Sequence, residues 1–170
     1  MANPACHPRH QGICRRARAR REIALRELLL KTPEETILLG RKLGASVSGG
    51  IVIALRGGLG AGKTTFTKGF ARGLGIDEEV TSPTYTIVSE YEGRLRLHHV
   101  DAYRLSGPED FDSVGGEDLI SDSGGVCVIE WSERIEDALP PDAVVADFVV
   151  KEDGARLLRI EGRALEELIP

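Results

Sequence analysis

The chain has 170 residues, of which 41% are hydrophobic and 29% are charged, and its net charge is −5 at pH 7. This composition predicts one globular domain with a single core, and no run approaches the ~20 apolar residues that a membrane span needs. The N-terminus lacks the apolar stretch of a secretory signal, and three cysteines cannot all pair. We therefore expect a reduced, cytoplasmic protein without a membrane partner.

Residues 1–31 differ in charge from the rest of the chain. They carry eight Lys or Arg and two acidic residues, whereas residues 32–170 sum to −11. A basic tail of this kind can contact nucleic acid. We favour a solvated, disordered N-terminal extension of residues 1–31, followed by the domain over 32–170. The tail also contains residues of the types that bind zinc, but their spacing fits no common zinc motif: Cys6, His7, His10 and Cys14.

The first predicted element is a short strand at residues 28–30, and a helix start follows directly. Thr32 is the expected N-cap, Pro33 occupies the first helical position, and Glu35 closes a capping box. Apolar residues at helical spacing continue this helix as far as the next glycine pair. The apolar run at 51–55 is then typical of a strand buried on both faces.

Helices and strands alternate in the rest of the chain. A helix is predicted at 63–74, two strands at 85–91 and 95–100 form a hairpin, and Pro108 opens a short helical stretch. Further strands are expected at 126–129, 143–150 and 156–160, the last two joined by an Asp-Gly turn. The prediction is an α/β fold with a mixed parallel and antiparallel sheet flanked by helices. The order of the strands does not follow from the sequence.

The glycine-rich segment from Gly57 to Thr64 fits the pattern G-x-x-x-x-G-K-[ST] at every fixed position. It lies between a predicted buried strand and a predicted helix, as a P-loop requires. Small residues let the backbone wrap around phosphates, and the helix presents its positive N-terminus to them. Lys63 can then reach the β- and γ-phosphates, and the Thr64 hydroxyl can bind Mg²⁺. The sequence therefore predicts a P-loop NTPase fold.

A nucleotide hydrolase also needs acidic residues near the metal, and two candidates follow predicted strands. Asp101 follows one, and Glu130 resembles a Walker B acid at the carboxyl edge of the sheet, where α/β proteins bind ligands. An ordinary solvated acid remains the alternative for each. Thr84 lies after the P-loop helix, where switch-type NTPases sense the γ-phosphate. A plain turn fixed by Pro83 is the alternative there.

Three further residues lie beside these acids. His98 and His99 precede Asp101 on a predicted strand, so we expect one to face inward and the other outward, and we interpret both as structural. Trp131 is the only tryptophan of the chain. It directly follows Glu130, and it is either a core residue or a lid beside the nucleotide.

Four further motifs occur along the chain: Leu59-Gly60-Ala61-Gly62-Lys63-Thr64-Thr65, Ser82-Pro83-Thr84-Tyr85, His99-Val100-Asp101-Ala102-Tyr103-Arg104-Leu105 and Val128-Ile129-Glu130-Trp131. In this order and spacing they resemble the TsaE (YjeE) family, over about residues 32–162. The family usually has an aspartate after the first P-loop glycine, where this chain has Gly58. That position is not a fixed member of the P-loop pattern, so phosphate binding should survive.

The resemblance implies an ATP hydrolase of tRNA threonylcarbamoyladenosine biosynthesis, which modifies adenosine 37. The partners would be TsaD and TsaB, with tRNA met indirectly through the complex, and hydrolysis would reset that complex between turnovers. By motif match, Thr64 and Glu130 would hold Mg²⁺, and Asp101 would lie near the metal and the γ-phosphate, where it would orient water. Lys63 and Thr84 are the other residues expected to take part in catalysis. The other residues implied at the ATP site are Glu35, Gly57, Gly60, Ala61, Gly62, Thr65 and Glu133.

Three other functions remain as alternatives. A small-molecule P-loop kinase has this size and topology. It normally needs an arginine-bearing lid and an acceptor pocket. Arg104 and Arg134 are candidates for the lid arginines, but the sequence contains no lid-like insertion. A GTPase typically selects guanine with an N-K-x-D loop, which the sequence lacks. A nucleotide-dependent scaffold without turnover is the third.

Overall fold

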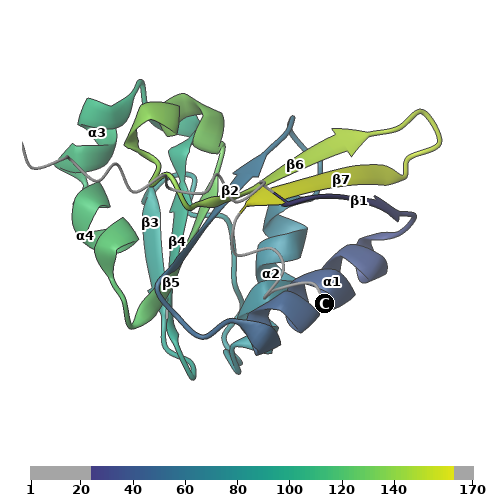
Figure 1. Ribbon diagram of the computed structural model, residues 1–170, viewed down its shortest axis with the longest axis horizontal. Coiled ribbons are helices and arrows are strands. Elements are labelled where there is room, and N and C mark those ends of the chain that lie inside the picture. Colours follow the sequence, from purple (N-terminus) through teal and green to yellow (C-terminus); the bar gives the residue numbers. More distant parts are fainter. Residues whose placement is uncertain (1–23, 163–170) are drawn as a thin grey trace, which may run out of the picture.

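The computed structural model describes residues 24–162, which form a seven-stranded mixed sheet with helices on both faces (Figure 1). The strand order is β1-β7-β6-β2-β5-β4-β3. Strands β6, β2, β5 and β4 run parallel, and β1, β7 and β3 join antiparallel to their neighbours. This confirms the predicted α/β class. The strands are β1 (Ala24–Leu30), β2 (Ile51–Arg56), β3 (Val88–Tyr91), β4 (Arg96–Asp101), β5 (Gly125–Glu130), β6 (Val144–Val150) and β7 (Arg156–Gly162).

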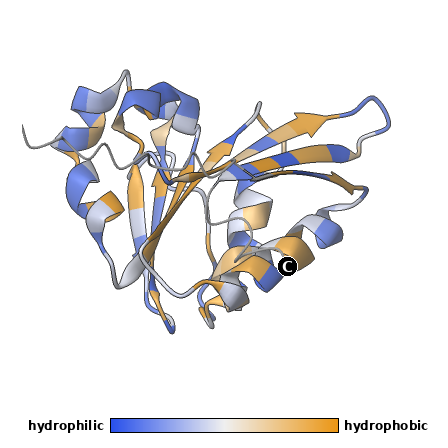
Figure 2. Ribbon diagram, in the orientation of Figure 1, coloured by the Kyte–Doolittle hydropathy of each residue, from blue (hydrophilic) through white to orange (hydrophobic). Residues whose placement is uncertain are grey.

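Helices cover the sheet in two groups (Figure 1). On one face α1 and α2 pack over a core centred on Phe66 and Phe70, and on the other α3, α4 and the 3₁₀ segment η2 pack over Phe111 and Ile129. Figure 2 shows hydrophobic residues concentrated in the strands and polar residues on α3 and α4. Among the described residues, no helix has the length and apolar character to cross a membrane. The helical elements are α1 (Pro33–Ser46), α2 (Lys63–Gly73), η1 (Ala102–Arg104), α3 (Pro108–Ser113), α4 (Gly116–Ser121) and η2 (Ser132–Ala138).

The two helices of the larger core meet along a seam of glycines. Gly40 and Gly44 of α1 face Gly69 and Gly73 of α2, and a Cβ added at any of them would collide with the backbone of the opposite helix. At Gly44 it would meet the carbonyl oxygen of Phe70. Only glycine permits this approach, so α1 is held close to the helix that follows the P-loop.

The start of α1 follows the sequence closely. The Thr32 hydroxyl accepts the N–H of Glu35 at 3.3 Å, as predicted for an N-cap. The reciprocal bond of the capping box is displaced by one residue, because Oε2 of Glu35 accepts from the backbone N–H of Lys31 at 2.6 Å rather than from that of Thr32. Glu35 therefore ties the end of β1 to the first turn of α1.

The domain begins earlier than the predicted boundary at residue 32. Strand β1 starts at Ala24 and pairs antiparallel with β7 over its whole length, from Gly162 back to Arg156. The predicted short strand at 28–30 is only its last part. The predicted disordered extension of residues 1–31 is therefore wrong for residues 24–30, which form β1. The rest of the extension and the zinc alternative lie outside the described residues.

The structure corrects two further predictions. Strand β3 begins at Val88 rather than at residue 85, because the preceding segment is bonded to Asp101 and Ile87 adopts a positive φ of 67°. The expectation that one of His98 and His99 faces outward is wrong. Strand β4 lies between β3 and β5 with both of its faces covered, so both histidines are buried.

Candidate active site

The glycine-rich loop joins the end of β2 to the first turn of α2. Gly57 and Gly62 have φ values of 125° and 117°, which side-chain-bearing residues rarely adopt. A Cβ at Gly57 would also lie 2.5 Å from the carbonyl oxygen of Phe148 on β6. The fixed glycines of the pattern are therefore required by the backbone, and the loop opens toward the N-terminus of α2, where backbone N–H groups favour anions.

Lys63 points back into this loop. Its Nζ donates to the carbonyl oxygens of Gly57 at 2.5 Å and Gly58 at 3.0 Å, and it lies 3.8 Å from the centre of the Trp131 ring. Burial lowers the pKa of Lys63, and the nearby carboxylates of Glu130, Glu133 and Asp101 oppose that shift. The lysine is thus held at the loop, beside several carboxylates and with little access to water.

Thr64 and Glu130 meet at the carboxyl edge of the sheet. The Thr64 hydroxyl donates to Oε2 of Glu130 at 2.9 Å, and the Glu130 residue is only 2% exposed. A hydroxyl and a carboxylate oxygen are ligands that Mg²⁺ prefers. Because these oxygens converge beside the P-loop lysine, the donor set fits a Mg²⁺ ion bound together with a nucleotide.

Asp101 ends β4, directly opposite Glu130 on β5 in the register of the sheet. Its Oδ2 accepts hydroxyl bonds from Ser82 at 2.6 Å and from Thr84 at 2.8 Å, and its Oδ1 accepts the N–H of Tyr103 at 3.0 Å. Hydrogen bonds therefore join the segment of Ser82 and Thr84 to Asp101, beside Glu130. Ser82 belongs to one of the four motifs behind the family resemblance, but no sequence pattern singled out its hydroxyl.

These side chains line a single cavity of about 480 Å³. Most of the residues predicted for the site are among its lining. Gly57 is not, although its carbonyl fixes Lys63, and Glu133 acts on the pKa of that lysine from outside the lining. Glu35 lies in the first turn of α1 and is not among the lining residues. The lining residues are Leu59, Gly60, Ala61, Gly62, Lys63, Thr64, Thr65, Ser82, Thr84, Asp101, Tyr103, Glu130 and Trp131.

Trp131 combines the two alternatives that the sequence left open. It packs against the core of Phe111 and also lines the cavity, and its ring lies 5.0 Å from that of Tyr103. Its φ of 58° is unusual for a bulky residue and turns the chain sharply after Glu130. The indole is therefore at the edge of the site, next to Lys63.

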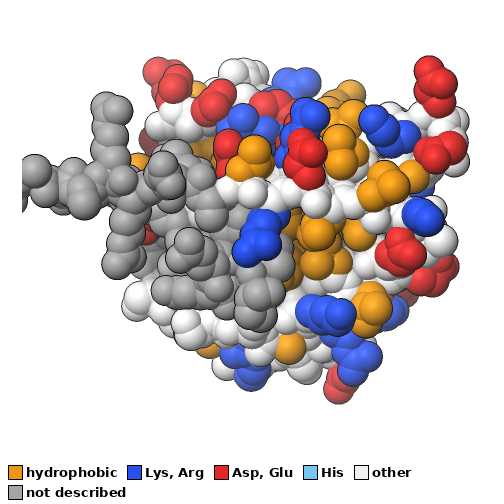
Figure 3. Space-filling view, turned by 45° about the vertical axis from the view of Figure 1, so that its right-hand side comes forward, with side chains coloured by type: hydrophobic (Ala, Val, Ile, Leu, Met, Phe, Trp, Pro, Cys, Tyr) orange, Lys and Arg blue, Asp and Glu red, His pale blue; other side chains and the backbone are white. Residues whose placement is uncertain are grey.

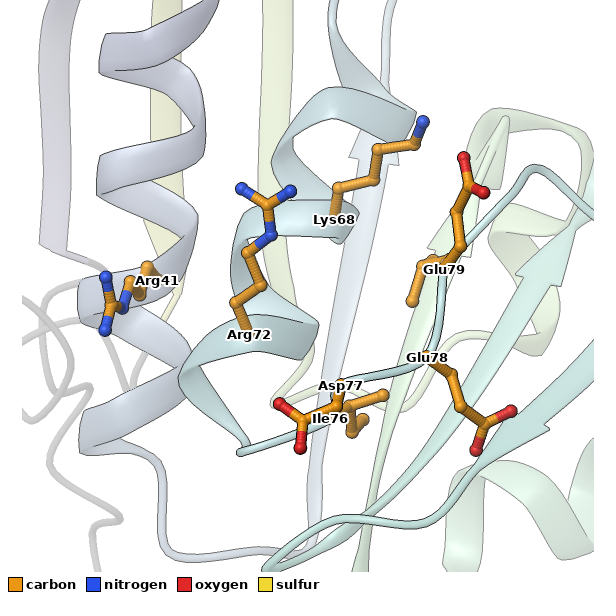
Figure 4. A pocket seen from close by; sticks show the side chains of 8 residues that line it. Arg41, Lys68, Arg72, Ile76, Asp77, Glu78 and Glu79 are labelled. Carbon is orange, nitrogen blue, oxygen red and sulfur yellow. The ribbon is translucent and has the colours of Figure 1, made fainter.

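A second cavity, of about 520 Å³, lies behind α2 and away from the P-loop. Arg41, Lys68 and Arg72 form one wall, and the acidic residues at 77–79 form the other. In Figure 4 the charged ends of these side chains point in different directions rather than toward a common point. This cavity therefore offers no convergent set of ligands.

The strand β2, the glycine-rich loop and α2, with acids at the ends of β4 and β5, define the P-loop NTPase fold. A family model described as "Threonylcarbamoyl adenosine biosynthesis protein TsaE" matches residues 30–158. The chain belongs to this TsaE family, which is involved in the biosynthesis of threonylcarbamoyladenosine in tRNA.

Individual relatives agree with this assignment. The chain is 44% identical over 130 residues to the tRNA threonylcarbamoyladenosine biosynthesis protein TsaE of Treponema pallidum, covering 76% of this chain and 96% of that protein. It is 46% identical over 123 residues to the TsaE of Bacillus subtilis, covering 72% and 75%. The crystal structure of Bacillus subtilis YdiB matches with a TM-score of 0.72 at 35% identity, covering 85% of this chain and 90% of that one.

Proposed function

We infer that the chain is a Mg²⁺-dependent ATP hydrolase that acts in tRNA threonylcarbamoyladenosine biosynthesis. The observation that carries this inference is the convergence of Lys63, Thr64, Asp101 and Glu130 on one cavity at the carboxyl edge of β2, β4 and β5. Parallel strands end together, so residues far apart in the sequence meet where α/β proteins bind ligands.

The P-loop residues bind the nucleotide in this proposal. The phosphates lie in the loop against the backbone N–H groups of Gly60, Ala61, Gly62 and Thr65, and Lys63 exchanges its two carbonyl contacts for phosphate oxygens. The position of Gly58 is open, since a Cβ there would meet nothing within 4 Å. The aspartate usual in the family would therefore fit, and its absence leaves the phosphate contacts in place.

Thr64 and Glu130 would hold Mg²⁺, which supplies charge neutralisation on the phosphates when bound. Asp101 is the proposed residue that orients the attacking water, because it is an acceptor at the cavity and is itself fixed by three hydrogen bonds. In this proposal Thr84 senses the γ-phosphate, and its hydrogen bond to Asp101 links it to the residue that orients the water. The products are ADP and phosphate.

TsaD and TsaB are the proposed partners, with tRNA reached only through their complex. The edge of the cavity offers apolar surface for such a partner, since Leu59 at the loop tip is 93% exposed and Tyr85 is 86% exposed. Large exposed apolar residues beside a site are typical of an interaction surface. In this arrangement hydrolysis resets the complex between rounds of modification.

The kinase alternative finds no support in the cavity. Among the described residues that line it, none is an arginine. The two arginines that a kinase would use lie over aromatic rings instead, with Cζ of Arg104 4.6 Å from the ring centre of Tyr85 and Cζ of Arg134 5.2 Å from that of Tyr103.

The test is ATP hydrolysis by the pure protein, with and without a TsaD–TsaB pair, for the wild type and for Glu130→Gln. This substitution keeps the shape of the side chain but removes its charge, so we expect hydrolysis to fall at least tenfold while some nucleotide binding remains. Glu161→Gln, at an exposed glutamate of β7 that does not line the P-loop cavity, is the matched control and should not alter the rate. Normal turnover by Glu130→Gln with partners present would reject the proposal that Glu130 binds Mg²⁺.

A further inference from the structure

Two adjacent histidines of β4, His98 and His99, are buried on opposite faces of the sheet, with exposed fractions of 4% and 0%. Their neighbour Leu97 packs into the core under α1 and α2, while Val100 packs into the core of Phe111. Since side chains alternate along a strand, His99 shares the face of Leu97, where α2 lies, and His98 shares the opposite face.

His99 makes one polar contact, and that contact reaches the proposed metal site. Its Nε2 lies 2.8 Å from Oε1 of Glu130, while the other oxygen of Glu130 accepts the hydroxyl of Thr64 at 2.9 Å. An ionised carboxylate only accepts hydrogen bonds, so Nε2 is the donor. A chain of hydrogen bonds therefore runs from β4 across β5 to the first turn of α2.

The second ring nitrogen argues against a role in packing alone. Nδ1 of His99 is buried and has no hydrogen-bond partner in the described part of the chain. An unpaired buried polar atom is unfavourable, so an apolar side chain would fill this space at a lower cost in free energy. The bond from Nε2 to Glu130 is the feature that an apolar residue could not provide.

We propose that His99 is a positioning residue for Glu130. This inference rests on the proposed function, in which Glu130 is a Mg²⁺ ligand. The N–H of His99 fixes one carboxylate oxygen and the plane of the group, so that the second oxygen stays directed toward Thr64. Partners behind a ligating carboxylate orient it, and their removal typically lowers metal affinity or activity by about 10- to 100-fold.

His98 provides a matched control on the same strand. It is nearly as buried, and its Nε2 lies 2.9 Å from Oδ2 of Asp122. Its Nδ1 lies 2.8 Å from Oε1 of Glu90 but, like Nδ1 of His99, makes no hydrogen bond within the described residues. Neither carboxylate lines the P-loop cavity. The same substitution at His98 therefore measures the loss of a buried histidine that contacts carboxylates without disturbing the site.

The experiment uses side chains of different reach at position 99. The amide nitrogen of His99→Gln extends about as far as Nε2, whereas that of His99→Asn is too short to reach Glu130. The affinity for ATP is measured by calorimetry on the full chain, once with Mg²⁺ and once with EDTA. The Mg²⁺-dependent gain is the ratio of the ATP affinity with Mg²⁺ to that with EDTA. We expect this ratio to be about tenfold or more smaller in His99→Asn than in the wild type, while the affinity in EDTA is unchanged. His99→Gln should restore most of the gain, and His98→Asn should keep all of it.

An undiminished gain in His99→Asn, or equal losses in His98→Asn and His99→Asn, would overturn the positioning role and leave the proposed function standing. Wild-type protein that gains no ATP affinity from Mg²⁺ would overturn both. If His99→Asn does not fold, the folded His99→Gln protein decides, because retention of the gain supports the role and its loss contradicts it.

Discussion

The centre of the sheet and the side that ends in β1 contribute differently to the molecule. Each of the central strands β2, β4 and β5 ends at the cavity, and each provides a polar group there through the P-loop, Asp101 or Glu130. The side formed by β6, β7 and β1, which we call the wing, provides no lining residue. Parallel strands with a common end can assemble a site, as β2, β4 and β5 do here. In the wing, β6 runs parallel to β2, but β6, β7 and β1 pair antiparallel with one another, so their successive ends lie at opposite edges of the sheet.

The wing instead packs against the P-loop and contributes to the core under α1 and α2. Phe148 of β6 lies against Gly57 and Gly62, and Leu158 of β7 packs into the core under the helices. Leu25 and Leu29 of β1 are exposed. Figure 3 shows hydrophobic and charged side chains mixed on the side of the molecule that faces the viewer there. If this division is right, substitutions at the centre should affect chemistry, and those on the wing should affect stability at most.

The largest effect is expected at Lys63. Lys63→Ala removes the cation that faces the β- and γ-phosphates, and a hydrogen bond to a charged group is worth roughly 1.5–3 kcal/mol. We expect hydrolysis to be abolished and ATP affinity to drop about ten- to a hundredfold, with the protein still folded. Calorimetry and a phosphate-release assay check this, and unchanged turnover by a folded Lys63→Ala protein would rule out the P-loop mechanism.

The seam between α1 and α2 should give the next largest effect, because it packs α1, which follows β1, onto the helix that follows the P-loop. Gly44→Ala places a Cβ against the backbone of Phe70, which a change of rotamer cannot relieve. Helix propensity favours alanine by about 1 kcal/mol, but overpacking typically costs about 1–3 kcal/mol, so we expect a net loss of stability in urea unfolding.

Gly107→Ala is the control for this substitution, since a Cβ there would meet nothing within 4 Å and the backbone is extended. It should change the unfolding free energy much less. Equal effects of the two substitutions would show that the close contact between the helices is not important for stability.

A pH-dependent effect is expected on the face opposite to the P-loop. The hydrogen bond to His98, then the N–H of Gly124, lower the pKa of Asp122 below its usual value of 3.8. A carboxyl with a lowered folded pKa stabilises the protein above its unfolded pKa, and this stabilisation is lost as the pH falls through the folded value. Asp122→Asn should therefore be less stable than wild type at pH 7, with the difference shrinking below about pH 4. A difference that stays the same at both pH values would contradict the assignment.

The smallest effect is expected on the wing. Arg159 pairs with Glu27 at 2.8 Å, and both side chains are about half exposed, at 50% and 52%. Exposed pairs of this kind contribute about 0.2–1 kcal/mol. Arg159→Ala should lower stability by no more than this and leave ATP hydrolysis unchanged. A loss of hydrolysis would show that the wing takes part in the chemistry.

The sequence predicted the P-loop, its flanking strand and helix, and the mixed sheet, because these are encoded in local patterns of glycine and apolar residues. It did not predict the start of β1, whose strand conformation depends on pairing with β7, more than a hundred residues away in the chain. The late start of β3 has the same kind of cause, since bonds from Ser82 and Thr84 to Asp101 hold the preceding segment.

The site shows the same limit. The sequence could predict four of the residues that line the cavity. Lys63 and Thr64 belong to the P-loop pattern, and Asp101 and Glu130 each lie at the end of a recognisable strand. The role of His99 could not, because its contact with Glu130 depends on β4 lying next to β5, and strand order does not follow from periodicity. Glu35 takes part in the cap of α1, as its position after Thr32 predicted, and its place near the base of the nucleotide stays a prediction.

The most direct test of the proposed function is multiple-turnover tRNA modification by a reconstituted set of TsaD, TsaB and this protein, with threonylcarbamoyl donor, tRNA and Mg-ATP supplied. We predict that modification continues over many rounds with the wild type and stops after about the first round when Lys63→Ala replaces it. Sustained modification with Lys63→Ala, or without this protein at all, would contradict the proposal that its ATP hydrolysis resets the complex.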